Sequence, residues 1–201
     1  TKVSKSLGNT YSIQQLEEMG YGPMDLRMFT LQGHYESEGN FTFENLDGAK
    51  NRLQNWRNYA VLRHQIHDRL ADDATKNDDS KYVSLLATSG AIREALQDNL
   101  NTPEALRIVD EAFGKLDGRD IEHIHQYGLV ELLRAIDDML GLQLLTSTPD
   151  ISDDEKRTIL EHTRARENKD WAASDKLRDD LIKKGIALRD TSAGSIWTYL
   201  G

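Results

Sequence analysis

The sequence predicts a mainly α-helical protein, a helical bundle followed by a small C-terminal α/β module that ends in a hairpin. Three observations support this fold class. Apolar residues recur at spacings of three and four along several segments, as they do on the buried face of an amphipathic helix. Residues that favour helix caps stand in front of these segments. Only the last part of the chain, from residue 186, has the pattern of short strands joined by a turn.

Two short helices are predicted near the start of the chain. Ser12 and Gln15 have the spacing of a capping box, and Gly20 is placed to end the helix that follows them. Pro23 is expected at the first position of a second helix, because a proline there has no hydrogen bond to lose. This second helix is predicted to continue to Gly33.

Longer helices are predicted for the bundle. The first covers residues 43–71 with Thr42 as its cap. Its apolar stripe consists of Leu46, Ala49, Leu53, Trp56 and Ala60. A polar loop at 72–80 separates it from a helix over 81–97. Thr102, followed by Pro103, is expected to cap the next helix. The last helix of the bundle stops at Gly141, and its stripe consists of Ile121, Ile124, Leu132, Leu133, Ile136 and Met139.

Residues 146–151 are the best candidate for a domain boundary. Behind them, Ser152 and Glu155 form another capping box and open a helix to about residue 168. A further helix over about 170–184 is ended by Gly185. Two short strands, around 186–188 and over 195–199, are then joined through Gly194. The predicted domains are therefore residues 1–40, 41–145 and 152–201.

Composition limits the classes of protein to consider. The 201 residues are 38% hydrophobic and 29% charged, which is typical of a globular protein. No apolar run approaches the length of a membrane span, and the first residues lack the pattern of a secretory signal, so none is expected. The absence of cysteine excludes disulfides and thiolate metal sites. Of the six histidines, only His64 with His67 and His123 with His125 form close pairs, and neither pair has a convincing further ligand, so we expect no metal site.

The charge is distributed unevenly along the chain. A net charge of −9 argues against a protein that coats nucleic acid by bulk attraction. Residues 152–201, however, carry equal numbers of basic and acidic side chains, so the excess negative charge lies before them. Any nucleic acid is therefore expected to prefer the C-terminal module, through local arrangement of side chains.

Two lysines near the start, Lys2 and Lys5, form the first cluster with chemical meaning. They lie three residues apart on a polar loop followed by glycine, which suits the binding of a polyphosphate that must later leave. A polar N-terminal tail without a binding function would have the same composition. The residues alone do not decide between these interpretations.

The helix predicted from residue 170 presents an aromatic, a carboxylate and a guanidinium on one face. Trp171, Asp175 and Arg178 lie within about 60° of one another on a helix that turns by about 100° per residue. Such a face suits the stacking and hydrogen bonding of unpaired bases. The alternative is that Trp171 packs at the helix start while Asp175 and Arg178 form a surface ion pair. Trp197 is expected in the core rather than in this site.

The chain resembles the cysteinyl-tRNA synthetases, a family of class I aminoacyl-tRNA synthetases. The loop with Lys2 and Lys5 resembles the lysine-serine signature loop of that class, with Val3 where methionine is usual. Four further groups of residues occur in the order of the family, namely Arg27 with Gly33-His34-Tyr35, Asn40-Phe41, Leu100-Asn101-Thr102-Pro103-Glu104-Ala105, and a closing block. The closing block runs from Arg164 through Trp171-Ala172, Asp175, Arg178-Asp179, Gly185-Ile186 and Asp190-Thr191 to Gly194–Trp197.

This resemblance implies an assignment for each part of the chain. Residues 1–40 would hold the signature loop and contact the tRNA stem, 41–145 would form the helical bundle, and 152–201 would recognise the anticodon. Lys5 would contact ATP and stabilise the transition state of cysteine activation, and Lys2 would assist it. The residues that match the anticodon contacts of the family are Arg166, Trp171, Asp175 and Asp190.

The resemblance also implies the partners. The enzyme would use ATP with magnesium, cysteine and the tRNA for cysteine. The nucleotide-binding domain, with a zinc site that selects cysteine, is expected before Thr1, so we expect this chain alone to bind no cofactor and to be inactive. A monomeric, cytoplasmic protein without membrane contact is expected.

One departure and two alternatives remain. Glu36 and Glu38 stand where the family usually has arginine and proline, which puts a phosphate contact by this loop in doubt. The chain could also be a free-standing, non-catalytic RNA-binding paralogue, or a relative that ligates cysteine to an aminosugar. The intact block from Arg166 to Asp190 argues against the aminosugar ligase, because that enzyme reads no anticodon.

Overall fold

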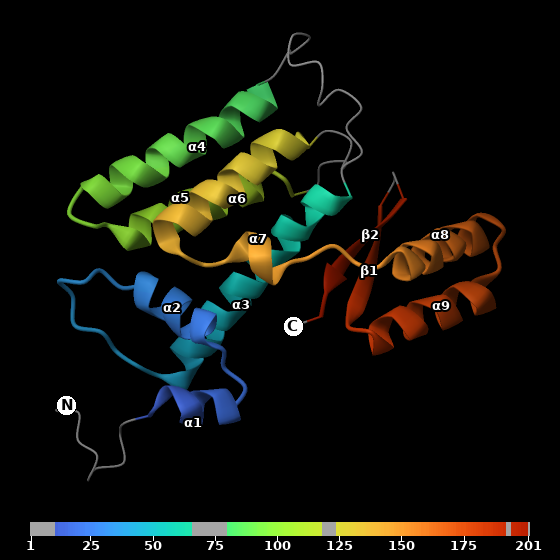
Figure 1. Cartoon of the computed structure of the whole chain (residues 1–201), viewed down its shortest axis with the longest axis horizontal. Helices are drawn as coiled ribbons and strands as arrows, with labels where there is room; N and C mark the ends of the chain where they lie inside the picture. Colours follow the sequence, from blue (N-terminus) through green and yellow to red (C-terminus); the bar gives the residue numbers. More distant parts are fainter. Residues whose placement is uncertain (1–10, 66–79, 118–123, 192–193, 201) are drawn as a thin grey trace.

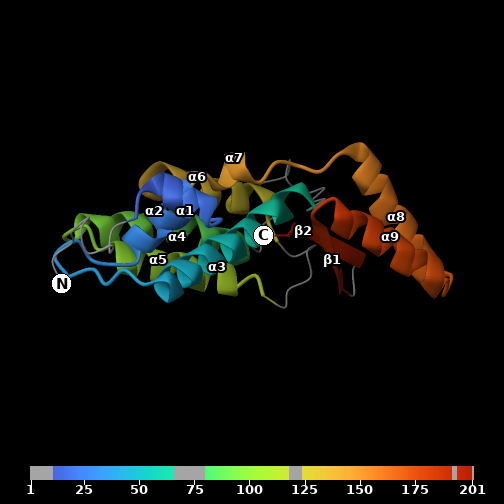
Figure 2. The ribbon, with the colours of Figure 1, turned by 90° about the horizontal axis from the view of Figure 1, so that it is seen from below.

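The computed structural model describes residues 11–65, 80–117, 124–191 and 194–200. Within these residues the chain is mainly helical and elongated, with the C-terminal module at one end of the long axis (Figure 1). Figure 2 shows the same arrangement from below, with α4 and α5 at one end and α8 and α9 at the other. The predicted fold class, a helical bundle with a small C-terminal α/β hairpin module, is confirmed.

The elements follow one another in a simple order. The first part contains α1 (Ile13–Glu18), α2 (Pro23–Leu31), α3 (Phe43–Ala60) and the 3₁₀ turn η2 (Val61–His64). The bundle continues with α4 (Ser80–Gln97), α5 (Thr102–Gly114), α6 (Gln126–Leu140) and the short α7 (Leu144–Ser147). The C-terminal module consists of α8 (Asp153–Glu167), α9 (Trp171–Lys183), β1 (Ile186–Thr191) and β2 (Gly194–Tyr199).

Local sequence signals set most helix starts. The hydroxyl of Ser12 accepts a hydrogen bond from the Gln15 backbone, and the Gln15 side chain accepts one from the Ser12 backbone, so the predicted capping box is confirmed. Pro23 occupies the first turn of α2, and Thr42 caps α3, both as predicted. The second predicted box, at Ser152, is also present at the start of α8.

The starts of two predicted helices differ from the structure. The cap of α5 is Asn101, whose side chain accepts from the Glu104 backbone, and Thr102 is already the first helical residue. The last bundle helix begins only at Gln126, although Ile124 in front of it is buried as predicted. An apolar stripe marks the residues that face the core, and it does not require the backbone between them to be helical. Ile121 lies outside the described residues.

The helix predicted over 43–71 is shorter than expected. Its apolar stripe is buried as predicted, but α3 ends at Ala60 and continues as the 3₁₀ turn η2. There Val61 packs into the apolar cluster of the C-terminal module, whereas Leu62 packs into the bundle. Two consecutive residues must thus point into two different cores, which the turn accommodates. Residues 66–71 lie outside the described part of the chain.

One large apolar core joins α2 to α6. Its largest fully buried side chains come from five helices and include Met28, Leu53, Trp56, Ile92, Leu106, Phe113, Leu132 and Ile136. Ile196 of β2 belongs to the same core, so the C-terminal hairpin packs directly on the bundle. The indole of Trp56 stays satisfied by donating to Asp110 Oδ1 at 2.7 Å.

The C-terminal module packs α8 and α9 beside a two-stranded antiparallel hairpin. The register places Ile186 opposite Tyr199 and Asp190 opposite Ser195. A second apolar cluster holds this module together and consists of Val61, Ile151, Leu181, Ile186 and Trp197. The predicted strands and the predicted burial of Trp197 are confirmed.

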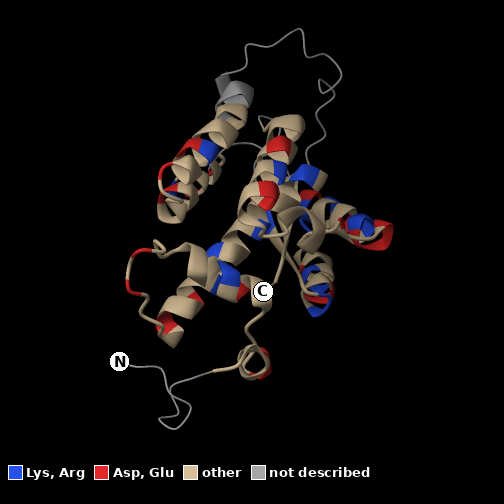
Figure 3. Cartoon of the chain, turned by 60° about the vertical axis from the view of Figure 1, so that its left-hand side comes forward, with Lys and Arg blue, Asp and Glu red and all other residues tan. Residues whose placement is uncertain are grey.

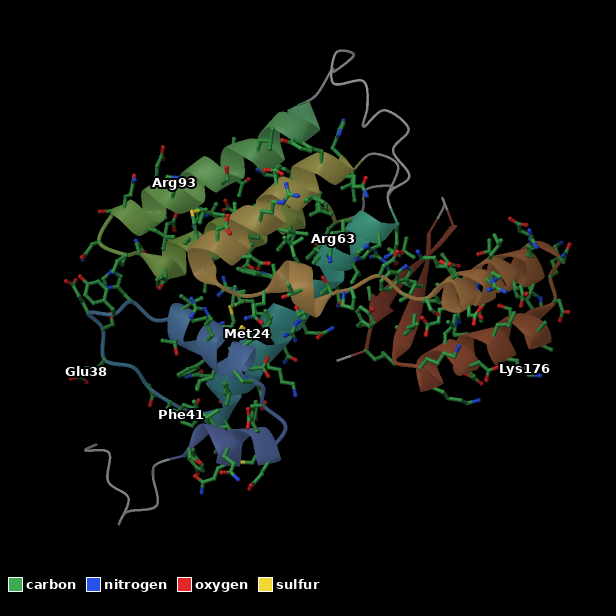
Figure 4. All side chains as sticks on the ribbon, viewed as in Figure 1. Met24, Glu38, Phe41, Arg63, Arg93 and Lys176 are labelled. Carbon is green, nitrogen blue, oxygen red and sulfur yellow. The ribbon has the colours of Figure 1, made fainter. Side chains whose placement is uncertain are left out.

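Polar contacts fix the module to the end of α3. The buried Arg63 guanidinium, at the centre of Figure 4, donates to the backbone of Leu145 and to both the hydroxyl and carbonyl of Thr148. The Gln65 side chain pairs with Trp197, donating to its carbonyl at 2.9 Å and accepting from its N–H at 2.8 Å. The segment 146–151 is therefore held by side chains from the bundle.

Across the described residues, no helix is long and apolar enough to cross a membrane.

Candidate nucleic-acid interface

The turn between α8 and α9 brings together residues predicted for the site. Arg166 lies in the last turn of α8, and Trp171 is the first residue of α9. Lys169 between them adopts a left-handed backbone conformation with a φ of 59°. Asp170 then caps α9 by accepting a hydrogen bond from the Ala173 backbone. The tight reversal places the two side chains at the same end of the module.

Trp171 is exposed and has a cation beside its ring. Its relative exposure is 56%, so it is not the packed helix-start residue of the alternative interpretation. The Arg166 guanidinium carbon lies 5.9 Å from the centroid of the Trp171 ring, within the range of a cation–π contact. An exposed aromatic ring next to a guanidinium offers a stacking surface and hydrogen-bond donors at one place.

Asp190, one residue before the end of β1, connects the other predicted residues. Its Oδ2 forms an ion pair with Arg166 Nη1 at 2.6 Å and accepts a hydrogen bond from Arg178 Nη2 at 2.8 Å. Its Oδ1 accepts from the Ser195 hydroxyl at 2.7 Å. Burial alone would raise the pKa of the Asp190 carboxyl, but the bond from Ser195 and the charges of both arginines outweigh it and lower the pKa. The carboxylate is therefore charged at neutral pH.

Asp175 lies one turn beyond Trp171 on α9, with its side chain exposed. Within the described part of the chain it forms no ion pair, and Arg178 pairs with Asp190 instead. The alternative of an ion pair between Asp175 and Arg178 is therefore wrong. Asp175 keeps its carboxylate oxygens available to an outside donor.

Two residues of this site were missed at the sequence level. His162 of α8 is fully buried, and its Nδ1 lies 3.5 Å from the Ser195 hydroxyl. Burial lowers the pKa of His162; the charge of Asp190 opposes this, and the charges of Arg178 and Arg166 reinforce it. The hairpin register could have identified Ser195, because it stands opposite Asp190. Nothing in the local sequence distinguishes His162.

The other two features singled out in the sequence are the lysine loop and the loop with Glu36 and Glu38. Lys2 and Lys5 lie outside the described residues. Glu36 has a partner within the chain, since its Oε2 accepts from the Asn99 amide at 3.0 Å. The Tyr35 hydroxyl donates to the Asn99 side-chain oxygen at 2.6 Å. These contacts give the Glu36 carboxylate a structural role in holding the loop on the α4–α5 turn.

Among the residues that the structure describes, no group of three or more histidine, aspartate or glutamate side chains could hold a metal ion. The C-terminal face instead combines an exposed aromatic ring, two guanidinium groups and two carboxylates. This chemistry suits recognition of unpaired bases by stacking and hydrogen bonding.

Cysteine–tRNA ligases are among the known proteins that are similar to this chain. No protein-family model matches the chain. A cysteine–tRNA ligase from Idiomarina loihiensis is 34% identical over 205 residues, and the match covers 98% of this chain and 41% of the relative. A cysteine–tRNA ligase from Nitrosococcus oceani is 34% identical over 226 residues, covering 98% of this chain and 45% of the relative. The chain thus spans less than half the length of these curated relatives. The resemblance inferred from its motifs is confirmed along nearly its whole length.

Proposed function

We propose that this chain is the C-terminal, tRNA-binding portion of a cysteine–tRNA ligase, and that its C-terminal module recognises the anticodon. The complete enzyme would activate cysteine with ATP and transfer it to its tRNA. The proposal is supported by the similarity to two cysteine–tRNA ligases over 98% of the chain. Because the chain corresponds to less than half of each relative, the activity of the whole enzyme is part of the proposal.

The observation that carries the anticodon-reading role is the exposed Trp171 ring with Arg166 beside it, 5.9 Å away. An unpaired base can stack on Trp171, and such a contact is worth about 1–3 kcal/mol when the side chain is truncated. Arg166 can donate to a base edge or a phosphate. Asp175 can accept a hydrogen bond from a base amino or imino group.

Asp190 contributes in a more restricted way. Its Oδ2 already has an ion pair with Arg166 and a hydrogen bond from Arg178, whereas Oδ1 accepts one from Ser195 and keeps one lone pair for a base. In the chain without RNA, Asp190 thus also pairs with Arg166, which lies beside Trp171.

For electrostatic reasons, discrimination between the cognate tRNA and other RNA must come from such base contacts. The net charge of −9 opposes bulk attraction of tRNA. Basic and acidic side chains are also interspersed over the molecule (Figure 3). An RNA ligand that binds this module must gain affinity from local contacts at the Trp171 face.

The N-terminal loop would serve the chemical step. By the resemblance, Lys5 would contact ATP and stabilise charge on the reacting phosphate, and Lys2 would assist. These lysines supply one side of an ATP site. The residues that select cysteine, including the expected zinc ligands, would belong to the part of the enzyme that precedes this chain in its relatives.

Binding of two RNA hairpins tests the proposed function. The ligands are the anticodon stem-loop of the tRNA for cysteine and the same stem-loop with a scrambled anticodon. Trp171→Ala and Asp175→Ala are expected to weaken the cognate hairpin by about tenfold or more. Binding of the scrambled hairpin should barely change, because it never gained these contacts.

Two matched variants control for side-chain loss. Leu160→Ala removes another exposed apolar side chain from the module, and Asp138→Ala removes an exposed carboxylate from α6. Neither should affect the preference for the cognate hairpin. Circular dichroism checks the fold of each variant. Equal losses for both hairpins with an intact fold would mean that the face gives electrostatic support and does not read bases.

A further inference from the structure

We infer that Arg178 is a positioning residue for RNA binding, which acts through Asp190. Together with Ser195 it keeps the Asp190 carboxylate satisfied, so that Arg166 can exchange that carboxylate for an RNA group. This inference rests on the proposed function. It assigns a role to a residue outside the set that the resemblance implies.

The geometry shows one carboxylate shared by three partners from different elements. Arg166 comes from α8, Arg178 from α9 and Ser195 from β2, whereas Asp190 itself lies in β1, one residue before its end. The hairpin pairs Asp190 with Ser195, which fixes the position of the carboxylate relative to its hydroxyl donor. Both arginines form an ion pair with the same oxygen, Asp190 Oδ2, so one cation remains there when the other leaves.

The arrangement matters because water solvates the Asp190 carboxylate only in part. Its side chain is 29% exposed, and a partly desolvated carboxylate loses stabilisation when its only cation leaves. If Arg166 were that only cation, turning it toward RNA would leave the carboxylate unpaired. With Arg178 on Oδ2 and Ser195 on Oδ1, Asp190 stays paired when Arg166 moves. Arg178 thereby lowers the free energy required to release Arg166.

The two arginines differ in what surrounds them. The Arg166 guanidinium lies beside the exposed Trp171 ring, where a stacked base would sit. Arg178 has its Nε buried, and no described residue accepts a hydrogen bond from it. The buried Nε holds that side of the Arg178 guanidinium against the module, while the side chain as a whole is 34% exposed, compared with 38% for Arg166. Arg166 is therefore the arginine that exchanges partners, and Arg178 is the one that remains.

A double-mutant cycle on the 201-residue chain tests the inference, with the cognate and scrambled anticodon stem-loops as probes. Arg178→Gln should weaken the cognate hairpin by about tenfold, because Asp190 then retains Arg166, and should leave the scrambled hairpin nearly unchanged. In an Asp190→Asn background the same substitution should change affinity by less than about twofold, since no carboxylate remains to retain Arg166.

Conservative and control variants separate positioning from fold and bulk charge. Arg178→Lys should preserve most of the affinity, because a single ammonium donor can replace the one bond to Oδ2. Lys176→Gln removes an exposed cation from the outer side of the same helix (Figure 4) and should leave the preference for the cognate hairpin intact. If Arg178→Gln fails to fold by circular dichroism, Arg178→Lys and Ser195→Ala carry the test. Ser195→Ala should weaken only the cognate hairpin.

Three results would overturn the inference. An equal loss from Arg178→Gln with Asp190 and with Asn at position 190 would mean that Arg178 contacts RNA itself. If Arg178→Gln lowers the affinity for the cognate hairpin in neither background, Arg178 does not position Arg166. An unmodified chain that binds both hairpins equally would overturn the proposed function and this inference together, whereas the first two results leave the proposed function standing.

Discussion

At the scale of single residues, Arg63 and His162 are buried polar side chains with opposite hydrogen-bonding situations. Arg63 is 8% exposed, and its guanidinium donates to four acceptors, in Ala60 of α3, Leu145 of α7 and Thr148 in the segment before α8. His162 is fully buried, and its Nε2 has no hydrogen-bond partner among the described residues. Arg63 therefore stabilises the junction, whereas His162 makes the folded state sensitive to protons.

Arg63→Ala is expected to destabilise the chain by roughly 2–4 kcal/mol, because three carbonyl groups and the Thr148 hydroxyl lose a charged donor away from water. Urea unfolding followed by circular dichroism measures the change. Arg157→Ala, which removes an exposed arginine that pairs with the exposed Asp154, is the matched control and should stay within about 1 kcal/mol of the unmodified chain. Equal effects of the two substitutions would contradict the assigned role of Arg63.

The unfolding free energy should also depend on pH through His162. Burial lowers its pKa from the ordinary value of 6.5, so the unfolded chain binds the proton more tightly than the folded chain. The contribution of neutral His162 to the free energy of unfolding is therefore fully present above pH 6.5 and decreases as the pH falls below that value. His162→Gln should reduce this decrease. The measurement is urea unfolding at a series of pH values, and an unchanged pH dependence in the variant would refute the prediction.

At the scale of elements, the ends of helices fix how the parts meet. Gly141 ends α6 in the left-handed conformation with a φ of 66°. Next to it, Arg27 of α2 donates from Nε to the Leu140 carbonyl at 2.6 Å. The glycine thus serves two purposes, since it permits the backbone conformation and leaves room for the arginine. The link from α2 to the end of α6 depends on both.

Gly141→Ala is expected to destabilise the chain by roughly 1–3 kcal/mol, through the strained φ and through contact with Arg27. A Cβ at this position would lie 2.6 Å from Arg27 Nη2. Gly48→Ala is the matched control, because Gly48 lies within α3 and a Cβ there meets nothing within 4 Å. The control should stabilise the chain by about 0.5–1 kcal/mol. Thermal unfolding compares them, and a shift of the same sign in both would contradict this account.

At the scale of the whole molecule, one apolar core joins α2 to the C-terminal hairpin. In Figure 1, α1 and α2 lie in the half of the long axis that is away from α8 and α9. The core of α2–α6 connects the two parts, and Ile196 carries that core into the hairpin. Arg63 and Gln65 add polar links to the same junction. The candidate site on the C-terminal module is thereby held in place relative to α2.

The chain alone is expected to be unable to activate cysteine, because it would supply only one side of the ATP site and catalysis depends on positioning both reactants. Cysteine-dependent exchange between ATP and pyrophosphate is the assay. In the full-length enzyme, Lys5→Ala should slow this exchange by about 10²–10³-fold, as for the loss of one charge contact in the transition state. Clear activity from the isolated chain, or an unchanged rate for Lys5→Ala, would contradict the corresponding assignment.

Much of the architecture could be predicted from the sequence because it depends on short-range backbone geometry. Capping boxes, the stripe of α3 and the positive φ of Gly185 after α9 are properties of a few neighbouring residues. The grouping of Trp171, Asp175 and Arg178 on α9 likewise follows from the helical repeat. The fold class and the composition of one face of the candidate site were therefore accessible without a structure.

The tertiary structure alone decided which side chains from different elements meet. It ended α3 at Ala60, where neighbouring residues enter two cores, and it gave Arg178 to Asp190 rather than to the nearby Asp175. It also buried His162 beside Ser195. Periodicity within one element identifies the face that a residue occupies, but the partner across that face depends on how several elements pack. The sequence thus determined most helix starts and the common face of Trp171, Asp175 and Arg178 on α9, and packing determined the carboxylate that Arg166 and Arg178 share.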